Sequence, residues 1–252
     1  MYPTIRRLLC LLVLLFPTTL LCRANSGNNL TILFHSNPPL SYEEGGARSG
    51  YIAEIVDAML REIPITTQAH YMPVARAFQT LAAQKNTLMY PVTRLPEREH
   101  LYEWIGPVAQ RSITAYKLKA RKDIQITQLS DLSNYHLGIV RELASSKNIL
   151  ANPAINKDLI DFAPTHESNF RKFLLGRNDL IVSSEWTAIY MMRTLNHSMR
   201  ELEPVLVLDQ QHQYYIALNK NTDPVLVSRL RAAFYRLEKA GLLEQLKQKY
   251  LD

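Results

Sequence analysis

The chain has 252 residues, of which 47% are hydrophobic and 21% are charged, and its formal net charge is +6 at pH 7. A chain of this length can bury one large hydrophobic core or two smaller ones. The sequence holds no block of lysine and arginine and no glycine-rich phosphate loop, so this modest charge argues against nucleic-acid binding and indicates a solvated surface.

The first 24 residues are typical of a cleaved secretory signal peptide. Arg6 and Arg7 precede an almost uninterrupted apolar run, Leu8 to Leu15, and the stretch ends in Cys22-Arg23-Ala24. The run is too short for a membrane span, so we expect export to the periplasm and cleavage after Ala24.

The predicted cleavage removes both cysteines, Cys10 and Cys22, and lowers the net charge to +3 because three arginines and no acidic residue leave with them. A mature chain without thiols has no disulfide or cysteine metal site and suits an oxidising compartment. The seven histidines lack metal-ligand spacing, and lone ones such as His70 and His136 are interpreted as surface or loop residues. We expect no cofactor, no metal and no catalytic residue.

Strands and helices are predicted to alternate at the start of the mature chain. Apolar spacing predicts strands at Leu30–Phe34 and Thr87–Tyr90 and helices from Ile52 to Leu60 and from Val74 to Leu81, with Tyr71 just before the second helix. With a further strand between the two helices, the order is β-α-β-α-β, which predicts parallel pairing. Ligands of open α/β sheets bind beyond the carboxyl ends of the strands, so the loops there are candidates for a binding site.

The stretch from Tyr90 to Pro107 carries the most informative side chains. Thr93 lies five residues before Arg98, and Pro96 between them disfavours helix at the preceding residue, so the chain should leave a strand in a tight turn. Arginine can bind a carboxylate or phosphate through two parallel hydrogen bonds, and a hydroxyl can add a third. The alternative is a surface turn with ordinary exposed ion pairs.

A second α/β unit is predicted after Pro107. Its expected elements are strands at Ile113–Leu118, His136–Val140 and Asp179–Val182, a short helix at Gln128–Leu132 and a helix from Ser168 that Gly176 ends. Ser145 is expected to cap a helix after the second strand and to leave backbone donors facing a cleft.

The end of the chain is predicted to form a strand and two helices. The strand is expected at Gln213–Asn219. Asp223-Pro224 begins a helix whose apolar stripe runs from Leu226 to Leu237 and which Gly241 ends, and a final short helix follows.

Leu95-Pro96-Glu97-Arg98 and the following Trp104-Ile105-Gly106-Pro107 resemble the family-3 solute-binding proteins of bacterial ABC transporters, the amino-acid-binding type. The resemblance implies an α/β periplasmic binding protein type 2 fold. It has two lobes, each a mixed, mostly parallel sheet flanked by helices, with the ligand cleft between them. The implied division is lobe 1 at residues 25–110 and 212–252 and lobe 2 at 111–211. Leu95 departs from the threonine usual there.

The resemblance also implies roles for single residues. In the family the arginine of this turn binds the ligand carboxylate with help from a hydroxyl five residues earlier, and the matching positions are Arg98 and Thr93. Asn37 and Tyr42, in the loop after the first strand, are candidates for one wall of the cleft, although a simple rigid turn carries equal weight. Tyr71 is a further candidate.

The second lobe leaves two alternatives open. Members that bind α-amino acids often place an aspartate shortly after the strand at 179–182 to hold the ammonium, and the matching position here is Ser184, followed by Glu185. Either Glu185 takes that role or the ligand has no α-ammonium. Ser145 would complete the site, although Glu142 and Leu143 depart from the family's pattern before it.

The sequence thus predicts a monomeric periplasmic protein that closes two lobes over a small carboxylate-bearing solute, as periplasmic binding proteins do. It would deliver the solute to an ABC permease and bind no nucleic acid. One alternative is a sensor subunit for a signalling receptor in the membrane. The other is an enzyme similar to cyclohexadienyl dehydratases, in which Glu185 would be the general acid.

Overall fold

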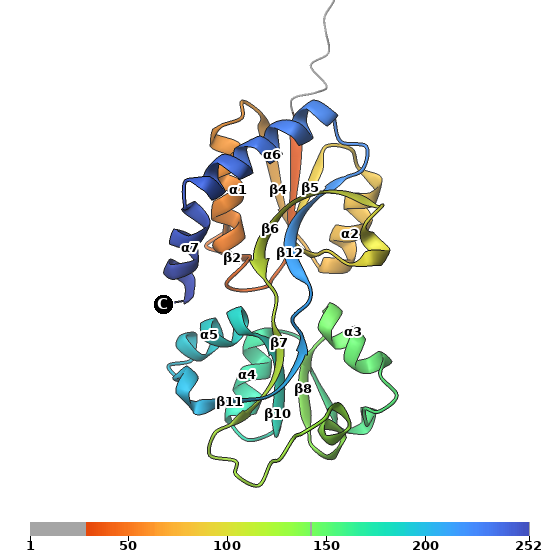
Figure 1. Cartoon of the computed structure of the whole chain (residues 1–252), viewed down its shortest axis with the longest axis vertical. Coiled ribbons are helices and arrows are strands. Elements are labelled where there is room, and N and C mark those ends of the chain that lie inside the picture. The colour runs from red at the N-terminus through yellow and green to blue at the C-terminus, as the bar shows by residue number, and fades with distance from the viewer. Residues whose placement is uncertain (1–28, 142, 252) are drawn as a thin grey trace, which may run out of the picture.

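The computed structural model describes residues 29–141 and 143–251 and contains two five-stranded sheets, each at the centre of one lobe (Figure 1). The predicted signal peptide lies outside the described residues. Within the described part, no helix has the length and apolar character needed to cross a membrane.

The first sheet has the strand order β4-β1-β5-β12-β6. Its strands are β1 (Asn29–Phe34), β4 (Thr66–Tyr71), β5 (Thr87–Thr93), β6 (Tyr102–Gln110) and β12 (Gln213–Asn219). The elements around it are the hairpin β2 (Tyr42–Glu44) and β3 (Ala47–Ser49), helices α1 (Tyr51–Arg61), α2 (Val74–Ala83), α6 (Pro224–Lys239) and α7 (Leu242–Leu251), and the 3-10 turn η1 (Pro96–Arg98). Strand β1 pairs in parallel with β4 and β5, as the strand-helix pattern predicts.

The second sheet has the order β11-β7-β10-β8-β9. Its strands are β7 (Ile113–Leu118), β8 (Leu137–Val140), β9 (Ile160–Ala163), β10 (Leu180–Ser184) and β11 (Leu202–Asp209). Its helices are α3 (Ala144–Ala151), α4 (His166–Leu174) and α5 (Glu185–Thr194), with 3-10 turns η2 (Leu129–Asn134), η3 (Lys157–Leu159) and η4 (Met199–Glu201). Strand β8 pairs in parallel with β9 and β10.

The two sheets share one plan. In each, a single strand runs against the other four: β12, which is antiparallel to β5 and β6, and β7, which is antiparallel to β10 and β11. Both sheets are therefore mixed with most strands in one direction, and the predicted α/β fold class is confirmed.

The chain crosses between the lobes twice, from β6 to β7 and from β11 to β12 (Figure 1). An ion pair between Arg111 and Asp209 ties the two crossings together, and the Asp209 carboxylate also accepts a contact from His212 Nδ1 at 2.9 Å. The predicted boundaries, residues 25–110, 111–211 and 212–252, stay a prediction.

Helix α6 packs on the first sheet. Its apolar residues Leu226, Leu230 and Phe234 lie in the same buried cluster as Leu30 and Ile32 of β1. The local sequence sets both ends: the Asp223 side chain accepts a hydrogen bond from the Val225 N–H at 2.8 Å, and Gly241 adopts a φ of 80° after the helix. The end of the chain thus returns to the first lobe.

Strand β5 extends to Thr93, beyond the predicted end at Tyr90. Proline has no N–H for a ladder hydrogen bond, which favours a strand end before Pro91. The structure instead places Tyr90-Pro91 opposite a register shift between Tyr215 and Ala217 of β12, where the pairing is interrupted. The longer strand carries Thr93 to the edge of the cleft.

Two predicted helix starts are wrong. Helix α3 begins at Ala144 after Leu143, without a side-chain cap, so Ser145 is its second residue and not its cap. Helix α4 begins at His166, because the Thr165 side chain accepts a hydrogen bond from the Ser168 N–H at 3.1 Å and stops the first turn from fraying.

We expect Leu230→Ala to lower the free energy of unfolding by roughly 2–5 kcal/mol, because Leu230 is fully buried in the first core. Tyr235→Ala on the solvent side of the same helix is the control, with an expected change within about 0.5 kcal/mol. Urea denaturation followed by circular dichroism measures both. Equal losses would show that α6 does not pack as described.

Candidate functional site

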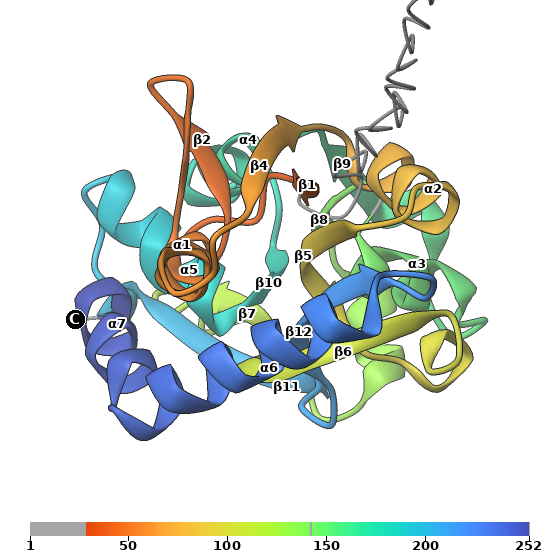
Figure 2. The same cartoon turned by 90° about the horizontal axis from the view of Figure 1, so that it is seen from above.

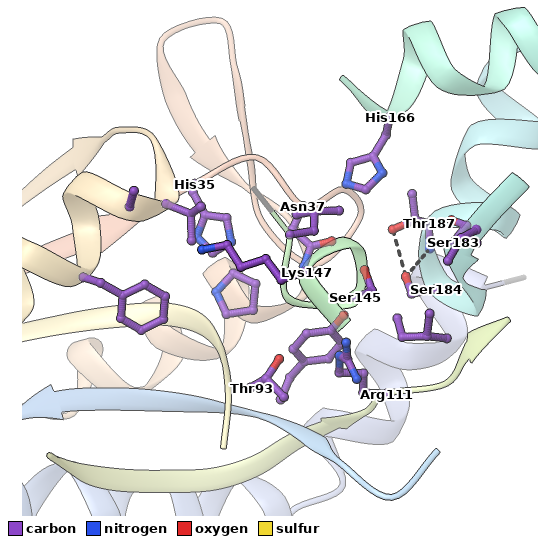
Figure 3. Close-up of a pocket in the computed structure, with 18 of the residues that line it drawn as sticks. His35, Asn37, Thr93, Arg111, Ser145, Lys147, His166, Ser183, Ser184 and Thr187 are labelled. Carbon is purple, nitrogen blue, oxygen red and sulfur yellow. Dashed lines mark hydrogen bonds between the residues drawn. The ribbon is translucent and has the colours of Figure 1, made fainter. Parts of the chain in front are cut away.

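A cavity of about 120 Å³ lies between the lobes. Its walls come from the loop after β1, the end of β5 and helix α2 on one side, and from the end of β10 and the first turns of α3, α4 and α5 on the other (Figure 3). The site thus lies beyond the carboxyl ends of strands in both sheets, where open α/β sheets bind ligands.

The cavity brings together five of the eight residues predicted from the sequence. They are Asn37, Thr93, Arg98, Ser145 and Ser184. The other three, Tyr42, Tyr71 and Glu185, do not line it. The five come from separate elements of both lobes, so only the folded chain assembles them.

Arg98 lies at the cavity without a carboxylate partner. Its Nη1 donates a hydrogen bond to the Thr93 carbonyl at 3.3 Å, and its guanidinium lies 4.5 Å from the centre of the Phe78 ring. Burial lowers the pKa of the guanidinium, which still stays cationic at neutral pH. Among the described residues Arg98 forms no ion pair, so donors of its planar fork remain for a ligand.

Arg94 is held differently. Its Nε donates to Glu99 Oε2 at 2.7 Å, and its guanidinium lies over the rings of Trp104 and Tyr215. Arg94 does not line the cavity, and the hydrogen bonds to Glu99 raise the pKa of the guanidinium. Of the two arginines in the turn, Arg98 lines the cavity and Arg94 does not.

The loop after β1 positions Asn37. The Asn37 N–H donates to the Ser41 carbonyl at 2.7 Å, and the Tyr51 N–H at the start of α1 donates to the Pro39 carbonyl at 2.9 Å. Gly50, with a φ of 117°, leaves room for this approach, since a Cβ there would lie 2.7 Å from the Pro39 oxygen. The loop is therefore fixed by backbone contacts, and Asn37 is buried at the cavity.

Two buried histidines from different lobes line the cavity. His35 follows β1 and His166 begins α4, with 7% and 8% of their surfaces exposed. Burial lowers the pKa of both side chains to about 4, and for His35 the nearby His166 adds to the effect. His35 Nδ1 and His166 Nε2 have no hydrogen-bond partner among the described residues.

The cavity also contains two cations that the sequence analysis missed. Arg111 is almost fully buried and pairs with Asp209, and Lys147 on α3 forms no ion pair within residues 29–141 and 143–251. No local motif marks either residue. Together with Arg98 they make three cations, and none of the described lining residues is an aspartate or a glutamate.

The end of β10 is tied to the first lobe. The Ser184 side chain accepts a hydrogen bond from the Thr187 N–H at 3.1 Å, and the Thr187 hydroxyl donates to the Pro38 carbonyl of the first lobe at 2.9 Å. The neighbouring Ser183 hydroxyl is buried and has no hydrogen-bond partner in the described part of the chain (Figure 3). Glu185, the first residue of α5, is exposed and lies outside the lining.

Tyr42 and Tyr71 lie away from the cavity. Tyr42 begins the hairpin β2–β3, which projects from the molecule in the view from above (Figure 2), and its ring packs 5.6 Å from that of Tyr190. Tyr71 ends the edge strand β4, is 47% exposed and packs beside Phe34. This geometry does not support the ligand contacts predicted for them.

Trp186 joins the lobes on the side of α5. It belongs to the second lobe by sequence position, yet it is buried in the core cluster of the first, with its ring 4.8 Å from that of Tyr51. Apolar burial of this kind stabilises the contact between the lobes. No group of three histidine, cysteine or acidic residues that could hold a metal ion occurs in the described part of the chain.

Two lobes on mixed sheets, with a cavity between them lined by both polar and apolar side chains, define a two-lobed solute-binding fold. Residues 30–252 match the model of bacterial extracellular solute-binding proteins, family 3, and the chain belongs to this family. The resemblance predicted from the turn at Arg98 is thereby confirmed.

Individual relatives agree with the family. A probable amino-acid-binding protein of Bacillus subtilis (strain 168), YxeM, is 22% identical over 215 residues, which are 85% of this chain and 80% of the relative. An ancestral arginine-binding protein bound to arginine superposes with a TM-score of 0.72 at 16% identity over 89% of this chain and 99% of that one. A histidine kinase sensor domain with similarity to periplasmic binding proteins superposes with a TM-score of 0.74 at 18% identity, over 90% of this chain and 97% of that one.

The buried histidines predict a loss of stability in mild acid. Their pKa values of about 4 in the fold lie below the ordinary 6.5, so the unfolded chain takes up protons first. The free energy of unfolding should be at its full value above pH 6.5. It should fall by about 1.4 kcal/mol per pH unit for each histidine as the pH drops toward 4.

Thermal melting of His35→Asn/His166→Asn at pH 7 and pH 5 tests this expectation. The double variant should lose less stability between the two pH values than the unaltered protein. His70→Asn, at an exposed position on β4, is the control and should leave the pH dependence unchanged. An unchanged slope in the double variant would contradict the expectation.

Proposed function

We propose that the protein is a periplasmic binding protein that captures a small carboxylate-bearing solute between its lobes and delivers it to an ABC permease. The observation that carries this proposal is Arg98, a half-buried cation at the cavity with no ion-pair partner among the described residues. A carboxylate completes such a guanidinium with two parallel hydrogen bonds.

Both lobes would contribute to capture. Arg98, Thr93 and Asn37 bind from the first lobe, while Ser145 and Ser183 bind from the second. Rotation about the crossings at residues 111–112 and 210–212 brings these groups together, in the manner of hinge closure. Closure also excludes water, and charged hydrogen bonds are stronger in a less polar environment.

The proposed setting follows from the family and the N-terminal sequence. The chain is exported, loses residues 1–24 and acts as a monomer in the periplasm, with lobe 1 at residues 25–110 and 212–252 and lobe 2 at 111–211. The proposed membrane partner is the permease; membership of a family of extracellular solute-binding proteins supports it, as does the likeness to a probable amino-acid-binding protein.

A sensor role is the second candidate, favoured by the likeness to a histidine kinase sensor domain. Stimulation of permease ATPase activity by the loaded protein supports delivery, whereas stimulation of kinase activity supports sensing. The third candidate, a dehydratase, has weaker support. The sequence predicts Glu185 as the general acid of such an enzyme, and Glu185 lies outside the cavity.

Arg98→Ala should abolish solute binding and leave the fold intact. Removing one partner of a partly desolvated arginine-carboxylate contact costs roughly 2–5 kcal/mol, or about 30-fold to several thousand-fold in affinity. The solute comes from a thermal-shift screen of amino acids, dicarboxylates and aromatic acids. Calorimetric titration then measures the affinity.

Arg94→Ala is the matched control, because Arg94 lies in the same turn but pairs with Glu99 outside the cavity. It should bind the solute nearly as well as the unaltered protein. Loss of binding in Arg94→Ala with normal binding in Arg98→Ala would assign the anchor to the other arginine. No loss in either variant would remove the turn from the site.

Trp186→Ala should weaken solute binding by about 10-fold or more, because apparent affinity falls with the fraction of molecules that can close. Small-angle scattering should show a larger radius for the variant. Met192→Ala on the same helix is the control, since Met192 packs within the second lobe's own core. Unchanged affinity in Trp186→Ala would show that this contact does not govern closure.

A further inference from the structure

We propose that the solute is a small dianionic acid, such as a dicarboxylate, with no ammonium group beside its carboxylate. This inference rests on the proposed function and narrows it. It follows from the charges and the unpartnered polar atoms that line the cavity, and from what each of them can bind.

The charged residues that line the cavity are all cations. They are Arg98, Arg111 and Lys147, and the described lining includes no carboxylate. An α-ammonium bound here would lose its hydration and lie among these cations, with no described carboxylate in the lining to act as its counter-ion. Desolvating a charge without a partner is strongly unfavourable.

Two described carboxylates, Asp209 and Glu185, are not placed to take that role. Asp209 already pairs with Arg111 and accepts contacts from His212 Nδ1 at 2.9 Å and from the Gln211 N–H at 3.1 Å. Glu185, which sequence position made the other candidate, is exposed at the start of α5 outside the lining. Of the two alternatives left open by the sequence, the structure favours a ligand without an α-ammonium.

Two cations with no partner among the described residues come from opposite lobes. Arg98 lies at the first-lobe wall, and Lys147, the fourth residue of α3, reaches into the cavity from the second lobe (Figure 3). One anionic group bound at Arg98 and a second bound at Lys147 would bridge the lobes. A dianion therefore stabilises the closed arrangement through both of its ends.

The neutral groups of the cavity favour the same ligand. His35 Nδ1, His166 Nε2 and the Ser183 hydroxyl are buried and lack partners among the described residues, which is costly until something binds them. Imidazole N–H and hydroxyl groups can donate, and carboxylate oxygens are pure acceptors with several free positions. A neutral imidazole can also accept a hydrogen bond from an ammonium, but it supplies no counter-charge.

Calorimetric titration of the full chain with matched acid pairs tests the inference. The pairs are glutarate with L-glutamate and succinate with L-aspartate, which differ by the α-ammonium alone. We expect the dicarboxylate of at least one pair to bind about 30-fold or more tighter than its amino acid. A preference for the amino acid in both pairs, abolished by Arg98→Ala, would overturn this inference and leave the proposed function in place.

Two variants separate the parts of the argument. Lys147→Gln should lower the affinity for the dicarboxylate by about 5- to 10-fold and leave the affinity for the monocarboxylate butyrate unchanged. Lys122→Gln, on the exposed surface of the second lobe, is the control and should change neither affinity. Ser184→Asp keeps a residue that can cap α5 and adds a carboxylate to the lining, so it should shift preference toward L-glutamate. Equal weakening of butyrate and dicarboxylate in Lys147→Gln, or binding of none of the four acids, would overturn the inference.

Discussion

The guanidinium of Arg98, which has no ion-pair partner among the described residues, is the constraint around which the cleft is organised. The other arginines near it are already satisfied: Arg94 binds Glu99, and Arg111 binds Asp209. Arg98 instead rests on the Phe78 ring and one backbone carbonyl, which hold its direction without neutralising its charge. A partly buried cation of this kind lowers the stability of the empty protein and gives that energy back when an anion binds. On the proposed function, the second lobe of the fold encloses that anion.

In the proposed function, one segment of the chain serves both closure of the lobes and binding of the solute. Trp186 and Thr187 adjoin Ser183 and Ser184 in sequence, so the segment that packs on the first lobe also forms the cavity wall. A shift that moves Trp186 out of the first core must therefore move the hydroxyls at the end of β10 away from Arg98. If the lobes close as proposed, the Trp186 contact and the second-lobe wall of the site move together, because they are adjacent turns of one chain segment.

Sequence reasoning succeeded where the information is local. Apolar spacing predicted the buried strands β1 and β5, which pair in parallel, and the stripe of α6, and one short turn supplied Arg98 and Thr93, which line the cavity. It missed His35 and His166, because residues so far apart in sequence meet only when the lobes come together. Tyr42 was chosen for its position in the loop after a strand, and the direction of the backbone that carries it away from the cavity was not available from the sequence.

The buried histidines and the ligand are subject to the same physical rule. Burial in the cleft makes a proton on His35 or His166 unfavourable, and their lowered pKa values express that cost. A ligand ammonium is another positive charge brought to the same desolvated place, beside Arg98 and Lys147. On the proposed function, the cavity that keeps two imidazoles neutral would also discriminate against a zwitterion, without any steric contact. The proposed selectivity for an anion would come from the absence of a carboxylate among the described lining residues as much as from the guanidinium of Arg98.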